Sequence, residues 1–287
     1  MVEIKITECP RDAMQVIKKW IPTADKIGYL QSLLKVGFDT LDCGSFVSSE
    51  VIPQLKDTGE VIRSLDLTST KTKLLVIIAN LRGAEIACNY DQIDYLGFPF
   101  SISENFQIRN VNKTIKESIS ELHFIADKVN KTNKELIVYL SMGFGNPYGD
   151  PWSPSIVSHW CKKLSYLGVK RISLSDTVGA AKKEDISSIF NTLIPEFSHI
   201  NFGAHFHTTL NNWYDKVDAA YSSGCNSFDG VINGFGGCPM ASDNLIGNMP
   251  TEKIISYCQE KGLETNINPL KFEVAYNYAT DIFVNYH

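Results

Sequence analysis

The chain has 287 residues, of which 44% are hydrophobic and 21% are charged, a balance typical of globular rather than disordered proteins. Its 27 Lys and Arg residues against 32 Asp and Glu give a net charge of −5, which argues against a general nucleic-acid binder. The longest apolar run, Leu74–Leu81, is far shorter than the roughly 18–20 residues of a membrane-spanning helix. We therefore expect neither nucleic acid nor a membrane as a partner.

Seven cysteines are scattered between Cys9 and Cys258, and no Cys-x-x-Cys pair occurs. An odd, scattered set predicts neither a disulfide framework nor a structural zinc site. The first ten residues carry acidic and basic side chains where a signal peptide would have its apolar core. The sequence therefore favours a soluble, reduced protein of the cytoplasm.

Short β-rich runs alternate with longer amphipathic segments along the whole chain. Strict alternation favours a parallel sheet and eight units favour its closure, so the pattern predicts a (β/α)8 TIM barrel, with one catalytic domain over residues 1–287. The predicted strands are Glu3–Thr7, Thr40–Cys43, Leu74–Ala79, Gln92–Leu96, Leu136–Ser141, Arg171–Ser175, Asn201–His207 and Ser227–Ile232. The predicted helices are Thr23–Val36, Glu50–Leu65, Gly83–Tyr90, Asn112–Asn130, Ser153–Leu167, Lys183–Phe197, Asn211–Ser223 and Thr251–Lys261.

A C-terminal helical extension, about residues 265–287, follows the last predicted barrel unit. Apolar residues recur at helical spacing between Pro269 and His287, which predicts one further helix. This helix either packs on the barrel exterior or forms a subunit interface. We expect a homo-oligomer, a dimer or larger.

His205 and His207 are the sharpest local signal for a functional site, because reactive side chains of TIM barrels gather where the strands end. Residues two apart on a strand face the same side, so both imidazoles can converge inside the barrel mouth. Asp12, which follows the first predicted strand, can add a carboxylate, and such a set suits a divalent metal. The alternative is a pair of hydrogen-bonded histidines in a polar lumen.

Three further charged residues lie at predicted strand ends. Arg11 can direct its planar fork at a substrate oxygen and stabilise enolate charge, or it can form a surface ion pair with Asp12. Asp42 lies at the second strand. Asp176 follows the sixth strand and serves either in proton transfer or as a helix N-cap.

The segment Asn233–Met240 (NGFGGCPM) predicts a glycine-rich loop over the barrel mouth. Its three glycines allow close backbone approach to a ligand or a hinge motion. Cys238 on this loop is either an idle surface thiol or a catalytic one. The loop lacks the Walker phosphate-binding pattern.

Together, these residues resemble the hydroxymethylglutaryl-CoA lyase family, one of the metal-dependent lyase and synthase barrels. The resemblance covers almost the whole chain, and its most specific element is the GGCP loop. The motifs that carry it are Pro10–Gln15 (PRDAMQ), Ser45–Ser48 (SFVS), Ile172–Gly179 (ISLSDTVG), His205–His207 (HFH) and Gly234–Pro239 (GFGGCP).

The resemblance implies a (β/α)8 barrel that cleaves 3-hydroxy-3-methylglutaryl-CoA, an acyl-CoA substrate, into acetoacetate and acetyl-CoA, with roles in leucine degradation and ketone-body formation. It also implies a bound Mg²⁺ or Mn²⁺ ion. The implied metal ligands are Asp12, His205, His207 and Asn248.

The resemblance further assigns catalytic roles. Arg11 would polarise the thioester carbonyl, and Cys238 would transfer a proton from the loop. Asp42 and Asp176 would line the site, and His205 would belong both to the metal set and to the catalytic set.

The chain departs from the family pattern in four places. Asp42 stands where glutamate is usual, Ala13-Met14 where Gly-Leu is usual, and Thr208 where aspartate is usual. The segment from Cys238 to Asn248 is one residue longer than expected. Two alternatives stay open: a related condensing synthase or aldolase acting on a 2-oxo acid, and a catalytically silent barrel that binds a metabolite.

Overall fold

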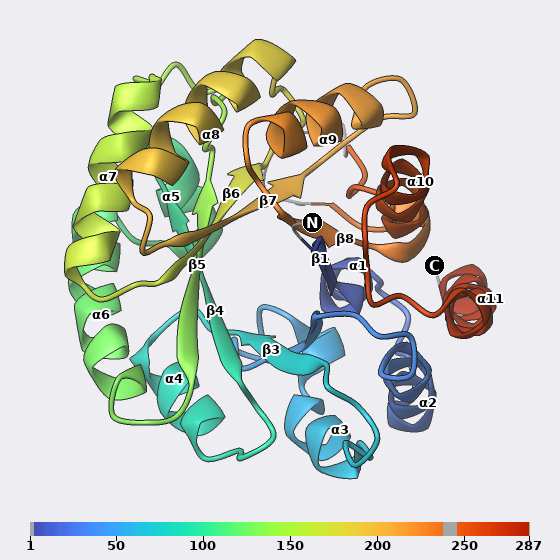
Figure 1. Ribbon diagram of the computed structural model, residues 1–287. Coiled ribbons are helices and arrows are strands. Elements are labelled where there is room, and N and C mark those ends of the chain that lie inside the picture. Colours follow the sequence, from blue (N-terminus) through green and yellow to red (C-terminus); the bar gives the residue numbers. More distant parts are fainter. Residues whose placement is uncertain (1–2, 238–245, 287) are drawn as a thin grey trace.

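The computed structural model describes residues 3–237 and 246–286. Within them, eight parallel strands follow one another in chain order around a closed barrel, and β8 pairs with β1 to complete it (Figure 1). This arrangement confirms the predicted TIM barrel. The strands are β1 (Lys5–Glu8), β2 (Thr40–Ser45), β3 (Lys73–Ile77), β4 (Tyr95–Ser101), β5 (Glu135–Ser141), β6 (Arg171–Asp176), β7 (Asn201–Phe206) and β8 (Ser227–Gly230).

Helices connect the strands and surround the barrel (Figure 1). Among the described residues, no helix is both long enough and apolar enough to cross a membrane. The α-helices are α1 (Pro10–Gln15), α2 (Thr23–Leu33), α3 (Thr58–Ser64), α4 (Leu81–Cys88), α5 (Glu104–Val111), α6 (Ile115–Val129), α7 (Pro154–Tyr166), α8 (Lys183–Glu196), α9 (Trp213–Ser222), α10 (Thr251–Lys261) and α11 (Pro269–Tyr286), with short 3₁₀ turns η1 (Pro53–Leu55) and η2 (Ile232–Gly234).

The predicted position of the fourth strand, Gln92–Leu96, is wrong, because β4 begins three residues later and continues to Ser101. Gly97 and Pro99 weaken the local strand signal, since neither residue favours a strand interior. The barrel nevertheless needs Gly97, because an added Cβ would lie 2.6 Å from Ile77 Cδ1 and 3.0 Å from Tyr139 Cε2. Pro99 lies beyond Gly97, the last β4 residue that pairs with β3.

Two predicted helices also differ from those in the structure. The expected helix Asn112–Asn130 begins at Ile115, after Asn112 in a left-handed conformation (φ 55°) that ends α5. Thr114 and Glu117 form a reciprocal capping box there, a signal that the sequence did contain. The expected helix Glu50–Leu65 is replaced by η1 and α3, while α1 and α5 were not predicted.

The predicted C-terminal helix is present as α11, and it packs beside α2 (Figure 1). The rings of Tyr278 and Phe283 lie 6.0 and 6.1 Å from that of Tyr29 on α2. A Cβ at Gly28 would clash with the Tyr278 hydroxyl, so this helix pair requires glycine there. The packing agrees with a helix on the barrel exterior, and the subunit-interface alternative stays a prediction.

Glu8, the last residue of β1, faces away from the lumen and is fully buried. Its carboxyl group accepts hydrogen bonds from the Ile232 backbone N–H (2.9 Å) and the Thr251 hydroxyl (2.5 Å). Burial raises the pKa of Glu8 to about 8, against the lowering effect of these two hydrogen bonds. Glu8 therefore binds a proton in the folded protein at pH values where the unfolded chain has released it.

We expect Glu8→Gln to raise the free energy of unfolding at alkaline pH. A raised carboxyl pKa makes the wild type lose stability as pH increases from about 4.5 to about 8, whereas glutamine stays neutral throughout. The gain should be roughly 1–3 kcal/mol at about pH 9 and shrink toward about pH 5. Urea unfolding at both pH values measures it, with exposed Glu50→Gln as the control. A pH-independent difference would contradict the assignment.

Candidate metal centre and active site

A cavity of about 240 Å³ opens at the C-terminal ends of the strands. One wall is polar and the other is apolar, so the cavity can hold a ligand with both kinds of surface. The polar wall includes Arg11, Asp12, Gln15, His205 and His207. The apolar wall includes Val47, Val51, Ile52, Phe106 and Val111, from the segment after β2 and from α5.

Asp12, His205 and His207 form a cluster whose ligand atoms all lie within 4.8 Å of one another. Asp12 comes from α1 directly after β1, and the histidines come from the end of β7. Burial alone would raise the pKa of Asp12, but Arg11, the two histidines and Asn248 together lower it. The carboxylate is therefore ionised at neutral pH, as a metal ligand must be.

Hydrogen bonds at the other ring nitrogen direct both histidines toward the cluster. His205 Nδ1 lies 3.1 Å from Asp229 Oδ2, and His207 Nδ1 lies 2.9 Å from the Asp176 backbone oxygen. Because a carboxylate and a carbonyl only accept hydrogen bonds, the proton of each neutral imidazole lies on Nδ1, and Nε2 then has the lone pair that a metal ligand needs. Burial would lower the pKa of His205, but the bond and charge of Asp229 raise it.

His207 Nε2 and Asn248 Oδ1 are buried and have no hydrogen-bond partner among the described residues. Such atoms are rare, since each costs about 1–3 kcal/mol when it stays unsatisfied. An antiparallel bridge places Asn248 beside His207, and the Asn248 amide nitrogen donates to the Phe235 carbonyl (2.9 Å). The two unsatisfied acceptor atoms, next to an ionised carboxylate, fit a divalent cation.

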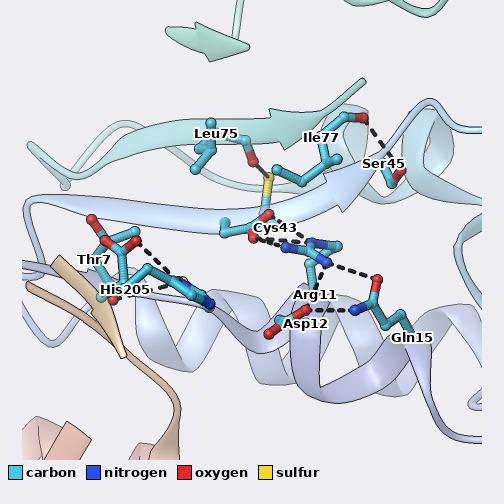
Figure 2. Close-up of polar contacts among 12 residues, drawn as sticks. Thr7, Arg11, Asp12, Gln15, Cys43, Ser45, Leu75, Ile77 and His205 are labelled. Atoms are coloured by element: carbon cyan, nitrogen blue, oxygen red, sulfur yellow. Dashed lines mark hydrogen bonds and ion pairs between the residues drawn. The ribbon is translucent and has the colours of Figure 1, made fainter. Parts of the chain in front are cut away.

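Arg11 is buried at the cavity, and Figure 2 shows Asp12 and Gln15 beside its guanidinium group. Its Nη1 donates to Asp12 Oδ1 (3.0 Å) and Gln15 Oε1 (2.8 Å), while Nη2 donates to Asp42 Oδ2 (2.6 Å). Its Nε bonds Asp42 as well (3.0 Å to Oδ2). Four of the five guanidinium N–H groups thus bond residues in the described part of the chain, and the fifth, on Nη2, has no partner there and can donate to a ligand.

Asp42 reaches Arg11 although its side chain is one methylene shorter than glutamate. Arg11 Nε donates to Asp42 Oδ1 (3.2 Å) and Nη2 donates to Oδ2 (2.6 Å), so the two residues form a bidentate pair, the geometry in which guanidinium and carboxylate bind most strongly. Burial raises the pKa of Asp42 to about 6 against the opposing charge of Arg11. Asp42 therefore orients Arg11 rather than lining the cavity itself.

The Asp176 side chain points away from the lumen. Its carboxylate accepts hydrogen bonds from Lys216 Nζ (2.5 Å) and the Ala181 backbone N–H (3.1 Å), and it does not line the cavity. The N-cap alternative is wrong, because Lys182 is the N-cap of α8. Asp176 contributes to the site through its backbone oxygen, which orients His207.

Cys238 lies outside the described residues, but the start of its loop is described. Gly236 (φ 81°) lies against α1, where an added Cβ would be 2.9 Å from both the Ala13 Cα and the Asp12 backbone oxygen. Both its φ and the close contact require glycine. The glycine-rich loop therefore starts directly on the helix that carries Arg11 and Asp12.

Sequence reasoning missed three residues around the site: Asp229, Gln15 and Tyr139. Asp229 orients His205, and Gln15 bonds both Arg11 and Asp12. Tyr139 packs its ring edge-to-face on His205, with 5.7 Å between centroids. The alternation of side chains along β8 and β5 could have predicted that Asp229 and Tyr139 face the lumen. That both contact His205 could not be predicted, because these contacts form only when the barrel closes.

We expect Asn248→Ala to weaken Mn²⁺ binding by about 10–100-fold, because it removes a ligand with an otherwise unsatisfied oxygen. Saturating Mn²⁺ should raise the melting temperature of metal-stripped wild type, since an ion that binds only the folded state stabilises it. Calorimetric titration and thermal unfolding measure the two effects. Asn191→Ala, at an exposed position on α8, is the matched control. Equal Mn²⁺ affinity in both variants would remove Asn248 from the site.

Known proteins similar to this chain include hydroxymethylglutaryl-CoA lyases. Hydroxymethylglutaryl-CoA lyase YngG of Bacillus subtilis is 31% identical over 258 residues, covering 90% of this chain and 85% of that protein. The cytoplasmic 3-hydroxy-3-methylglutaryl-CoA lyase of Rattus norvegicus is 30% identical over 268 residues, with 92% and 77% covered.

A solved structure shares the fold over nearly the full length. The HMG-CoA lyase from Acinetobacter baumannii, in complex with coenzyme A and 3-methylmalate, matches with a TM-score of 0.90 and 28% identity, covering 98% of this chain and 92% of that one. The family model described as HMGL-like matches residues 3–277, almost the entire described barrel. The chain therefore belongs to the HMGL-like family.

Proposed function

We propose that this protein is a carbon–carbon lyase that cleaves 3-hydroxy-3-methylglutaryl-CoA into acetoacetate and acetyl-CoA. The observation that carries the proposal is the buried Asp12–His205–His207 cluster next to Arg11, which keeps one guanidinium N–H without a partner among residues 3–237 and 246–286. The relatives at about 30% identity are named as lyases of this substrate, and the Acinetobacter relative was solved with coenzyme A.

Asp12, His205, His207 and Asn248 would hold Mg²⁺ or Mn²⁺, because two imidazoles with carboxylate and amide oxygens suit these ions better than a thiolate-preferring metal. When bound, such an ion takes up substrate oxygens and lowers the pKa of the hydroxyl group. The protons on both Nδ1 atoms keep the two histidines aligned as ligands.

Arg11 acts where negative charge develops. Once a base has taken the hydroxyl proton, the hydroxyl carbon becomes the ketone carbon of acetoacetate. The electron pair of the broken carbon–carbon bond stays on the thioester fragment as an enolate. The free Nη2 N–H of Arg11 would donate to the enolate oxygen, in a site that is largely shielded from water. Asp42 and Gln15 keep the guanidinium in place, so little reorganisation is needed during the reaction.

Protonation of the enolate carbon would complete acetyl-CoA, and we assign this step to Cys238. This assignment is supported by Gly236, two residues before Cys238, which contacts α1, the helix of Arg11 and Asp12. The apolar wall of Val47, Ile52 and Phe106 would receive the acyl-CoA and exclude water from the enolate.

We further propose that residues 1–287 act as one catalytic domain, because β1 and β8 close a single sheet. A homo-oligomer, a cytoplasmic location and a part in leucine degradation and ketone-body formation are likewise proposals. Free thiols at all described cysteines support a reducing compartment. The bidentate pairing of Asp42 with Arg11 removes the main reason for favouring a catalytically silent barrel.

Purified protein with Mg²⁺ or Mn²⁺ and a thiol reductant should release acetyl-CoA from hydroxymethylglutaryl-CoA. Acetyl-CoA is followed directly, over a panel of branched 3-hydroxyacyl-CoA substrates, with Asp12→Asn as the inactive control. A parallel reaction contains acetyl-CoA and 2-oxo acids and follows free thiol. Thiol release there, with no cleavage of any hydroxyacyl-CoA, would assign the protein to the condensing synthases instead.

Arg11→Lys should lower kcat by about 10²–10³-fold while Mn²⁺ affinity changes little, because lysine cannot maintain the bidentate contact and also donate to the enolate. Asp42→Asn should lower kcat less, since Arg11 stays present but is held more loosely. Steady-state kinetics and Mn²⁺ titration separate the two effects. Arg63→Lys, at a surface arginine beside Tyr90, is the control. Near-normal kcat in Arg11→Lys would exclude the enolate role.

A further inference from the structure

A second cavity, of about 680 Å³, opens at the opposite, N-terminal end of the barrel. It is lined by the first residues of several strands, including Lys5 of β1, Thr40 of β2 and Lys73 of β3. Its volume lies within the range of roughly 300–1,000 Å³ that small-molecule sites occupy. The lumen of a TIM barrel is ordinarily filled by layers of bulky side chains, so an open space of this size calls for a physical reason.

The space exists because small residues occupy inward positions. Thr7, Ser173, Gly203 and Ser227 line the cavity where branched apolar residues would fill the lumen. At Gly203 the three atoms nearest to an added Cβ all belong to Ser227, at 3.5 Å or more, which is an ordinary contact distance. At Gly97 an added side chain would contact its neighbours too closely, whereas at Gly203 there is space for a larger residue.

The two cavities are separated inside the barrel. Tyr139 lines both of them, and its ring lies edge-to-face on His205. Asp229 lines the N-terminal cavity and hydrogen-bonds His205 from that side. The N-terminal cavity is therefore a compartment of its own, directly behind the candidate metal centre.

The rim of this cavity is positively charged, opposite in sign to the whole chain. Lys73 and Arg171 at the rim pair with Asp94 and Glu135, each at 2.8 Å. Three further rim lysines form no ion pair within the described part of the chain: Lys5, Lys35 and Lys71. Asp39 opposes them, and it accepts a hydrogen bond from the Ile6 backbone N–H (3.0 Å). The rim therefore attracts anions.

The floor of the cavity has the opposite character. The Ser173 hydroxyl donates to Asp229 Oδ2 (3.0 Å), and Thr7 and Thr40 add further hydroxyl groups. A carboxylate with neighbouring hydroxyls accepts hydrogen bonds from neutral groups and repels a buried anion. Rim and floor together fit a molecule with a negative group at one end and hydroxyl groups at the other.

We propose that the N-terminal cavity binds a small hydroxylated anion, a polyol phosphate or a hydroxy acid. The anionic group lies among Lys5, Lys35 and Lys71, and the hydroxyl groups reach Ser173 and Asp229. This site opens at the opposite end of the barrel from the C-terminal cavity that we assign to the acyl-CoA, and Tyr139 lies between the two.

Calorimetric titration of the Mg²⁺-loaded protein at constant ionic strength tests the proposal with four probes: glycerol 3-phosphate, glycerate, inorganic phosphate and glycerol. We expect saturable one-to-one binding of glycerol 3-phosphate or glycerate, tighter than that of inorganic phosphate and glycerol. Tighter binding of glycerol 3-phosphate would identify the anionic group as a phosphate, and tighter binding of glycerate would identify it as a carboxylate. Absence of saturable binding by both, or equal binding of inorganic phosphate, overturns the proposal.

Variants locate the bound molecule. The double variant Lys35→Gln/Lys71→Gln should bind the preferred probe about tenfold more weakly, because two rim charges are lost. Gly203→Val should abolish binding by filling the lumen, and its backbone conformation accepts a side chain. If Gly203→Val does not fold, the lysine double variant alone tests the location of the site, because Lys35 and Lys71 are exposed and their replacement leaves the core intact.

Two controls complete the test: Lys162→Gln on the outside of α7, and Arg109→Gln on α5, which precedes Asn110 and Val111 of the acyl-CoA cavity. Neither should change affinity for the preferred probe. Loss of binding in Arg109→Gln, with affinity kept in the lysine double variant, would place the probe in the acyl-CoA cavity and refute the N-terminal site.

Discussion

The buried guanidinium of Arg11 is the charge around which the site is arranged. A buried ion needs opposite charge in good geometry, and removal of its partner typically costs about 3–5 kcal/mol. Asp42 from β2 and Asp12 from α1 supply that charge on two sides of the guanidinium. Because Asp12 also faces His205 and His207, the charge balance of Arg11 fixes the position of the carboxylate that completes the candidate metal centre.

The alternation of side chains along each strand decides which charged residues can do chemistry. Inward positions bring His205 and Asp229 together in the lumen. Outward positions direct Glu8 and Asp176 into the layer between the barrel and the helices. There Glu8 accepts hydrogen bonds from Ile232 and Thr251, and Asp176 accepts one from Lys216. A shift of one residue along a strand would exchange these inward and outward roles. Glu8 and Asp176 are therefore structural, whereas Asp229 orients His205 of the candidate metal centre.

The C-terminal helix is connected to the site as well as to the barrel wall. Tyr276 and Thr280 of α11 hydrogen-bond Asn233, which has a left-handed conformation (φ 62°) at the start of the glycine-rich loop. Three residues later, Gly236 lies on α1 beside Asp12. The extension therefore supports one end of the loop that carries the proposed proton donor, which gives it a function beyond covering apolar surface.

Hydrophobic periodicity determined the barrel, its eight strands and the terminal helix, because that periodicity is a property of neighbouring residues. It also placed His205 and His207 on one face. The bounds of β4 could not be predicted from the sequence, because Gly97 weakens the local strand signal. Glycine is present there because an added Cβ would lie too close to Ile77 and Tyr139 in the lumen. Only the tertiary structure decided that Asp229 orients His205 and that the Asp176 carboxylate leaves the site. These contacts join β8 to β7 and α9 to β6, and they form only when the sheet closes.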